Sequence, residues 1–394
     1  MQVRNQTYLR MKNKEDIINL LREKSRSYSD IARVLRLSNT AISKIADDLI
    51  SHNLIKREGD TKGRTGITLS INADFGYVLA VDFSGRELNL CAADFESRIL
   101  LQRNISEVVR FERRDFDRVI ETMREMIGSE TLKDRKLCCI SVATPGKLKD
   151  SGEFLLKPRF QGFENVSIRK VLGDTFGCDV VVKNDVNLAM EGEKAYGSAL
   201  RDVKNALMLH VDVGTGAALM LNGKIYEGSH GFAGEIGYFR LNMFSCAADS
   251  FDNLSYFNFY DSVSLYSSLS ILKREVQNGA EGYLKAYAEE KGISPSELTI
   301  KAMTEAYRAG DPLVRKVLNA SGRVIGTVAA NIAEFLDVDT VVLNGAVFEL
   351  GDPFLEVVSA YVEGKTVCYP ELMEKATLMG AVNAGLTKAF LNNF

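Results

Sequence analysis

The chain has 394 residues, 46% of them hydrophobic and 26% charged, which excludes a fibrous or disordered protein and indicates two or three globular domains. No apolar run reaches the ~18 residues that a membrane span needs, and the six cysteines show no CxxC pair, which argues against a disulfide framework or a cysteine-rich zinc cluster. The net charge of −3 is uneven, because residues 1–70 hold 14 Lys and Arg against eight Asp and Glu, a surplus of 6, which leaves −9 for the remainder.

Three helices are predicted within residues 13–52, because apolar side chains recur there at helical spacing. Their expected N-caps are Asn13, Ser29 and Ser38. A tight turn joins the second and third helices, as in a helix-turn-helix whose last helix enters the major groove of DNA. The side chains expected to contact base edges or phosphates are Ser38, Asn39, Thr40, Ser43 and Lys44.

A wing is predicted after these helices. Residues 53–57 and 67–71 read as two strands, and the Gly-rich stretch 59–66 between them offers Lys62 and Arg64 to phosphates or a minor groove. Residues 1–71 are therefore predicted to be a winged helix-turn-helix that binds double-stranded DNA. The alternative is a small helical domain that binds protein, against which the basic surplus and the polar helix face both argue.

The rest of the chain has an α/β pattern in which the second half echoes the first. Strands are expected at residues 77–82, 87–93, 98–105, 138–143 and 179–183, with a helix at 116–127, and again at 206–212, 215–221, 224–226 and 340–343. The segment V-D-F-S-G at 81–85 resembles V-D-V-G-T at 211–215. Two such halves imply two lobes with a cleft, and clefts are where ligands bind.

Several motifs resemble those of the ROK family (repressors, open reading frames, kinases). G-F-A-G-E-I-G at 231–237 is similar to the family signature, and T-P-G at 144–146 and N-D at 184–185 match further motifs in order. The resemblance implies a winged helix-turn-helix followed by a two-lobed, actin-like (ribonuclease H-like, sugar-kinase) ATPase fold. The expected domains are 1–71, a first lobe at 76–195 joined by a C-terminal helix at 377–394, and a second lobe at 196–376.

The same resemblance implies a sugar site. In the kinases of the family the aspartate of the N-D pair accepts a proton from the sugar hydroxyl, and Asp185 stands at that position, catalytic only if kinase activity is retained. Asn184 and Glu235 match family residues that bind sugar hydroxyls, and Tyr238 offers a further hydroxyl.

The two phosphate loops depart from the kinase pattern. In the first, Asp82 is followed by F-S-G-R-E, so that Gly85 remains but a second glycine and a threonine are replaced. In the second, Asp212 replaces a glycine and Gly214, Thr215 and Gly216 are shifted in register. Because a carboxylate beside the phosphate path repels ATP, ATP binding is not expected; phosphate binding by a re-registered second loop is the alternative.

The zinc site of the family is expected to be absent. The family histidine after G-E-I-G is Tyr238 here, and the family's trio of cysteines is reduced to Cys246. One soft ligand cannot build a tetrahedral structural site. No cofactor or metal is therefore expected.

The sequence predicts a sugar-responsive DNA-binding repressor of carbohydrate-utilisation genes without kinase activity. An ATP-dependent sugar kinase of the glucokinase or N-acetylhexosamine kinase type that retains a DNA-binding head is the alternative, supported by Asp185. A third is an architectural DNA binder whose body only dimerises. The expected partners are an operator, a sugar or sugar-phosphate, and a second copy in a homodimer or higher even oligomer. No signal peptide or membrane segment is expected, so the predicted location is the cytoplasm.

Overall fold

The computed structural model describes residues 2–59, 67–84, 87–105, 112–148, 154–156, 166–242 and 256–394. The chain divides by its contacts into two compact units. The first comprises Met1–Asp185 together with Leu378–Phe394, and the second comprises Val186–Thr377. No helix in the described part of the chain has both the length and the apolar content to cross a membrane.

The first unit begins with a small helical head. Its elements are α1 (Gln2–Glu23), β1 (Arg26–Ser27), α2 (Tyr28–Leu35), α3 (Asn39–Ser51), β2 (Ile55–Glu58) and β3 (Thr68–Ile71). The strands form an antiparallel sheet in the order β1-β3-β2. Buried side chains such as Ile17, Ile31, Ile42 and Leu49 come from all three helices, so one core holds a winged helix-turn-helix together, as the sequence predicts.

Two of the three predicted helix starts are wrong. Asn13 lies inside α1, which begins eleven residues earlier, at Gln2, because residues 2–12 contain good helix formers and neither Gly nor Pro. The N-cap of α2 is Ser27, whose side chain accepts from the Asp30 N–H at 3.2 Å. Pairing of Ser27 with Thr68 in the sheet gives it the extended backbone of a cap, whereas Ser29 lies in the first turn.

A five-stranded sheet follows the head, in the order β10-β7-β4-β5-β6. Its strands are β4 (Tyr77–Asp82), β5 (Leu88–Asp94), β6 (Ile99–Ile105), β7 (Leu137–Thr144) and β10 (Asp179–Asn184). The first three form an antiparallel meander, and β7 and β10 run parallel to β4. Strands β8 (Lys147–Leu148) and β9 (Phe154–Leu156) form a separate hairpin.

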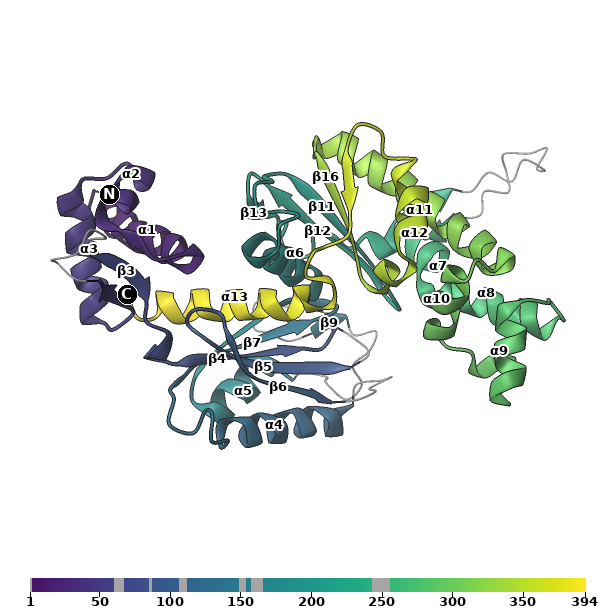
Figure 1. Ribbon diagram of the computed structural model, residues 1–394, viewed down its shortest axis with the longest axis horizontal. Coiled ribbons are helices and arrows are strands. Elements are labelled where there is room, and N and C mark those ends of the chain that lie inside the picture. The colour runs from purple at the N-terminus through teal and green to yellow at the C-terminus, as the bar shows by residue number, and fades with distance from the viewer. Residues whose placement is uncertain are drawn as a thin grey trace. The chain divides into compact units, whose positions relative to one another are not determined.

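Helices cover both faces of this sheet (Figure 1). On one face, α4 (Arg113–Ile127) and α5 (Ile168–Phe176) bury Phe116, Met123 and Leu172 against alternate strand residues. On the other lies α13 (Ala376–Leu391), where Gly385 lets the helix approach closely, since an added Cβ would lie 3.2 Å from Ser141 Cβ. The C-terminal helix thus covers one face of a sheet whose strands lie some 200 residues or more earlier in the chain.

The second unit contains a sheet with the same topology, in the order β13-β12-β11-β16-β17. Its strands are β11 (Ala206–Val211), β12 (Thr215–Leu221), β13 (Lys224–Ile225), β16 (Thr340–Asn344) and β17 (Thr366–Cys368). Again three strands form a meander, and two further strands run parallel to the first of them. The two sheets therefore repeat one arrangement, which confirms the predicted duplication.

Alternation along β11 divides the second unit's core into two layers. Leu207, Leu209 and Val211 face a large cluster, while Met208 and Ala206 face a smaller one with Met190. The smaller cluster includes α6 (Asp185–Tyr196). The larger includes α7 (Phe259–Val263), α8 (Leu265–Gln277), α9 (Tyr283–Lys291), α10 (Ile300–Arg308), α11 (Pro312–Leu336) and α12 (Asp352–Ser359). The short pair β14 (Arg240–Asn242) and β15 (Tyr256–Asn258) completes the unit.

Candidate functional site

The carboxyl ends of three parallel strands meet at one edge of the first sheet. Asn184, the last residue of β10, pairs with Thr144 at the end of β7, and Asp82, the last residue of β4, pairs with Ala143. Ligands of open α/β sheets bind outside the carboxyl ends of the strands. The sequence-predicted residues Asp82, Asn184 and Asp185 therefore lie at the edge where a ligand is expected.

Asp185 occupies the junction between strand and helix. It follows β10 directly and begins α6, and only 6% of its surface is exposed. A carboxylate in the first turn of a helix is favoured by the helix dipole. The amide of Asn184 and the carboxylate of Asp185 together supply donors and acceptors for a polyol.

The first phosphate loop turns back on its own aspartate. Oδ1 of the buried Asp82 accepts hydrogen bonds from the Ser84 N–H at 2.8 Å and the Ser84 hydroxyl at 2.5 Å. A glycine at position 84 could not form the second hydrogen bond, which requires the serine hydroxyl. Gly85 and Arg86 lie outside the described residues.

The second phosphate loop is a tight hairpin tip joining Val211 to Thr215. The Asp212 N–H donates to the Gly214 carbonyl at 2.9 Å, and the Val213 N–H donates to Asp212 Oδ1 at 2.7 Å. Two of the three amide groups in the tip are therefore bonded within the loop. An anion-binding loop instead directs such groups at the ligand.

The signature segment is held against β12 by two close approaches. Gly234 has a φ of +91°, its carbonyl accepts from the Ala217 N–H at 2.8 Å, and an added Cβ would lie 1.9 Å from Ala217 O. At Gly237 an added Cβ would lie 2.9 Å from Thr215 Oγ1. These contacts fix the half-buried Glu235 immediately before the turn Ile236–Tyr238.

The predicted sugar-binding residues fall into both units. Asn184 and Asp185 belong to the first, and Glu235 and Tyr238 belong to the second. Tyr238 is 57% exposed.

The candidate DNA interface is the outward face of α3. Ser38 Oγ accepts from the Ala41 N–H at 3.1 Å and caps the helix as predicted. Asn39, Thr40 and Lys44 are exposed, and Ser43 is half-buried. Lys62 and Arg64 lie outside the described residues, so their predicted role in the wing stays a prediction.

The acidic side chains of α3 pair with cations of the head. Asp47 Oδ1 accepts from Arg57 Nη2 at 2.5 Å, and Asp48 Oδ2 lies 2.7 Å from Lys14 Nζ. The hydrogen bond from Lys14 holds the pKa of Asp48 below its ordinary value. Lys44, by contrast, forms no ion pair within the described ranges, which leaves its charge available to a phosphate.

Two buried charged side chains could not be predicted from the sequence. Lys14 is a buried lysine, 6% exposed, and Glu193 is fully buried and accepts from the Ala199 and Leu372 N–H groups at 3.2 and 3.0 Å. Neither has a sequence signal, because the partners of Glu193 include a backbone group 179 residues away.

The metal-binding question concerns the segment after the signature. Cys246 and most of its neighbours lie outside the described residues. Within the described ranges, no three His, Cys, Asp or Glu side chains come together as a metal site would require.

Comparison with known proteins decides the family. The sequence model of the ROK family matches residues 78–382. The chain belongs to the ROK family. Among ROK relatives, the xylose repressor of Caldicellulosiruptor bescii is 24% identical over 89% of this chain and 87% of its own length. The transcriptional dual regulator NagC of Escherichia coli is 24% identical over 84% of this chain and 79% of its own length.

Solved ROK structures share the fold. A ROK family transcriptional regulator, described as a homologue of the E. coli MLC protein, covers 98% of this chain and 97% of its own length with a TM-score of 0.79 at 18% identity. A ROK glucokinase from Streptomyces griseus, solved with glucose and AMPPNP, covers 79% of this chain and 99% of its own with a TM-score of 0.64 at 19% identity. The winged helix-turn-helix and actin-like fold predicted from the sequence is confirmed.

Proposed function

We propose that the chain is a sugar-responsive transcriptional regulator that represses carbohydrate-utilisation genes. The observation that carries the proposal is a winged helix-turn-helix with a capped, polar third helix, followed by a ROK body. Relatives that span most of the chain are named xylose repressor and N-acetylglucosamine repressor. The proposed partners are an operator DNA, a sugar or sugar-phosphate and a second copy of the chain, and the proposed location is the cytoplasm.

The proposed sugar contacts are Asn184, Asp185, Glu235 and Tyr238. Asn184 and Asp185 are supported by their place at the carboxyl edge of parallel strands. Glu235 is supported by the two glycines that fix its backbone. Carboxylate, amide and phenol groups provide the mixture of donors and acceptors that recognises neighbouring sugar hydroxyls.

Kinase activity is not part of the proposal, because polar groups of both phosphate loops form hydrogen bonds within their own loop. Ser84 binds the carboxylate of Asp82, and the amides of Asp212 and Val213 are used inside the hairpin tip. These groups have to be released before they can hold a nucleotide phosphate or its metal ion.

The test of DNA binding is a titration of the chain with the DNA upstream of its own gene at several salt concentrations. Lys44→Ala is expected to weaken binding and to reduce the slope of log K against log[salt] by about 1. Lys291→Ala, which removes the same charge from α9 in the second unit, is the matched control. Equal affinity and slope for both variants and the wild type would contradict the assignment of α3.

The sugar test is calorimetry with D-xylose and N-acetylglucosamine, each with and without ATP. Binding of either sugar without ATP, lost in Asp185→Asn, is expected. The second candidate function, a sugar kinase that retains a DNA-binding head, is favoured by the buried Asp185 at the start of α6. ATP-dependent phosphorylation of a sugar by the wild type, lost in Asp185→Asn, would establish the kinase instead.

A further inference from the structure

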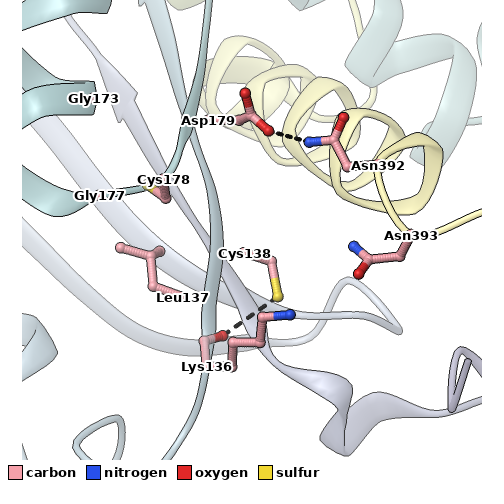
Figure 2. A pocket seen from close by; sticks show the side chains of 9 residues that line it. All are labelled: Lys136, Leu137, Cys138, Gly173, Gly177, Cys178, Asp179, Asn392 and Asn393. Carbon is pink, nitrogen blue, oxygen red and sulfur yellow. Dashed lines mark hydrogen bonds between the residues drawn. The ribbon is translucent and has the colours of Figure 1, made fainter.

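The residues at the end of α13 and directly after it contact three separate parts of the first unit. Asn392 Nδ2 donates to Asp179 Oδ2, at the first residue of β10 (Figure 2). Phe390 packs edge-on against Phe95 with ring centroids 4.9 Å apart. The Phe394 ring lies 5.5 Å from the ammonium of Lys14 on α1.

Strand β10 connects the first of these contacts to the proposed sugar contacts. It begins at Asp179, which Asn392 binds, and ends at Asn184, next to Asp185. Six residues of extended chain span only about 20 Å, and all six pair in register with β7. The strand therefore joins Asn184 and Asp185 to Asp179 through a short segment in which every residue pairs with β7.

Lys14 connects the other end to the recognition helix. Its ammonium is 2.7 Å from Asp48 Oδ2 on α3 and 5.5 Å from the centre of the Phe394 ring. Arg10 and His52 also lie within 4 Å of Asp48, at 3.5 and 3.7 Å. The ion pair with Asp48 keeps Lys14 fixed to α3, whereas a single partly exposed cation–π contact is weak enough to form and break.

We propose that Asn392 and Phe394 form a coupling element that reports the state of the Asn184–Asp185 edge to the recognition helix α3. Docking of Phe394 on Lys14 holds α1 and α3 against the body, and release of Phe394 frees the head. A sugar that contacts Asn184 and Asp185 changes the docking equilibrium through β10, Asp179 and Asn392. The ligand acts only by binding the docked and undocked states with different affinity.

A cavity in the same region gives no reason to assign a bound ligand there. A cavity of about 500 Å³ lies beside Asp179, Asn392 and Asn393 (Figure 2). Its polar side chains bond to the protein: Asn393 donates to Ala389 O, and Cys138 Sγ is 3.5 Å from Lys136 O. These contacts need no bound molecule, and they leave the Asp179–Asn392 hydrogen bond as the link between β10 and α13.

The experiments with sugar and DNA rest on the proposed function. A hydrogen-exchange experiment requires neither sugar nor DNA. Hydrogen exchange of the full chain reports whether α1 and α3 are held by Phe394. In Phe394→Ala, amides of α1 near Lys14 and of α3 near Asp48 are expected to exchange about two- to five-fold faster, the range that one cation–π contact gives. Phe394→Trp retains the ring and is expected to restore the wild-type rates. Phe335→Ala, at a phenylalanine 87% exposed on α11, is the matched control.

The coupling arm compares DNA affinity with and without D-xylose or N-acetylglucosamine. Phe394→Ala and Asn392→Ala are expected to bring the ratio of the two dissociation constants toward 1 while sugar binding measured by calorimetry persists. Asn393→Ala, which loses a hydrogen bond to the Ala389 carbonyl of α13, is expected to keep the wild-type ratio.

Each outcome decides a separate question. A wild-type chain that shows no sugar effect on DNA binding contradicts the proposed function, and the hydrogen-exchange arm then tests the docking by itself. A wild-type chain that responds to sugar, with an unchanged response in Phe394→Ala and Asn392→Ala, overturns the coupling element. Unchanged exchange rates of α1 and α3 in Phe394→Ala overturn the docking of Phe394 on the head.

Discussion

Gly234 shows how one residue positions the signature segment. Its φ of +91° favours glycine, and the space where a side chain would begin is occupied by Ala217 O at 1.9 Å. Any larger residue must move the segment away from β12. The glycines of the signature are therefore needed to place Glu235, the proposed sugar contact.

Gly234→Ala is expected to destabilise the chain by about 2–4 kcal/mol, because backbone strain and a steric clash add at one position. The measurement is guanidinium unfolding of the full chain. Gly214→Ala is the matched control, since an added Cβ at Gly214 meets no atom within 4 Å in the described structure, and it is expected to stay within about 1 kcal/mol of the wild type. Equal unfolding midpoints for the two variants would refute this account of the signature.

The buried cysteines Cys91 and Cys139 and the half-buried Cys178 and Cys368 give a prediction about reactivity. Burial raises the pKa of Cys91 and Cys139 to about 12 and that of Cys178 and Cys368 to about 11. The thiolate is the reactive form, so these groups stay protonated and unreactive at pH 8.

In a Cys246→Ser background, a thiol-specific disulfide reagent at pH 8 is expected to label the native chain far more slowly than the guanidinium-unfolded chain. The labelling rate of the native chain should still be rising at pH 9–10, because the thiolate fraction keeps increasing about tenfold per pH unit until the pH reaches the raised pKa values. Rapid labelling of the native chain at pH 8 would show that the thiols are not buried as described.

Single residues were predictable where the signal is local. Ser38 could be recognised as a cap because its hydroxyl bonds to a backbone group three residues away. Asn13 and Ser29 are also residue types that cap helices, but Asn13 lies inside α1 and Ser29 in the first turn of α2. Lys14 and Glu193 could not be found, because their burial depends on partners distant in sequence.

At the scale of elements, Glu193 joins α6 to the segment that precedes α13. Its fully buried carboxylate accepts from the Ala199 and Leu372 N–H groups, and an added Cβ at Gly197 would lie 2.0 Å from Glu193 Oε1. Lys194, next in α6, donates to the carbonyls of Leu200, Arg201 and Val203 at 2.7–3.0 Å. The loop after α6 therefore has little freedom.

Glu193→Ala is expected to lower the free energy of unfolding by about 2–5 kcal/mol, since two part-buried N–H groups lose their acceptor. Glu371→Ala is the matched control, because the exposed Glu371 carboxylate accepts from the N–H and the side chain of Ser198. Its expected cost is smaller, because water can replace an exposed acceptor. Denaturant titration of both variants compares the buried Glu193 carboxylate with the exposed Glu371 carboxylate. A larger loss of unfolding free energy in Glu371→Ala would contradict the role assigned to Glu193.

Strands were predicted more accurately than helix ends. The alternating pattern of β11 and β12 fixes both their faces and their limits, and the structure places both strands within one residue of the expected bounds. The start of α1 could not be inferred, because residues 2–12 lack the apolar periodicity on which the prediction relied. Helix propensity without a buried face leaves no such pattern.

At the scale of the whole molecule, the sequence revealed the duplication. The echo of V-D at 81–82 and 211–212 marks the ends of β4 and β11, the central strands of two sheets of the same order. The contact boundaries fall inside helices, after Asp185 in α6 and after Thr377 in α13. The first position carries no turn or linker signal, and the predicted lobe boundary lies ten residues later, after residue 195. The second lies within one residue of the start of the C-terminal helix that was expected, at 377–394, to join the first lobe.

The proposed dimer gives a prediction for the operator. Two copies of α3 reading DNA require two-fold related half-sites separated by about 34 Å or a multiple of it. Footprinting on the upstream DNA is expected to show two protected half-sites with this spacing, and light scattering an even number of chains. A single protected half-site bound by one chain would exclude the dimeric mode.

The position of α13 in the chain has a consequence for biosynthesis. Residues 186–377 form one continuous unit, whereas the sheet of the first unit lacks its α13 cover until residues 378–394 have been made. On the ribosome the second unit can therefore complete its fold first, while one apolar face of the earlier sheet, including Val78, waits uncovered. Chaperone capture of nascent chains should then centre on the portion that was synthesised first.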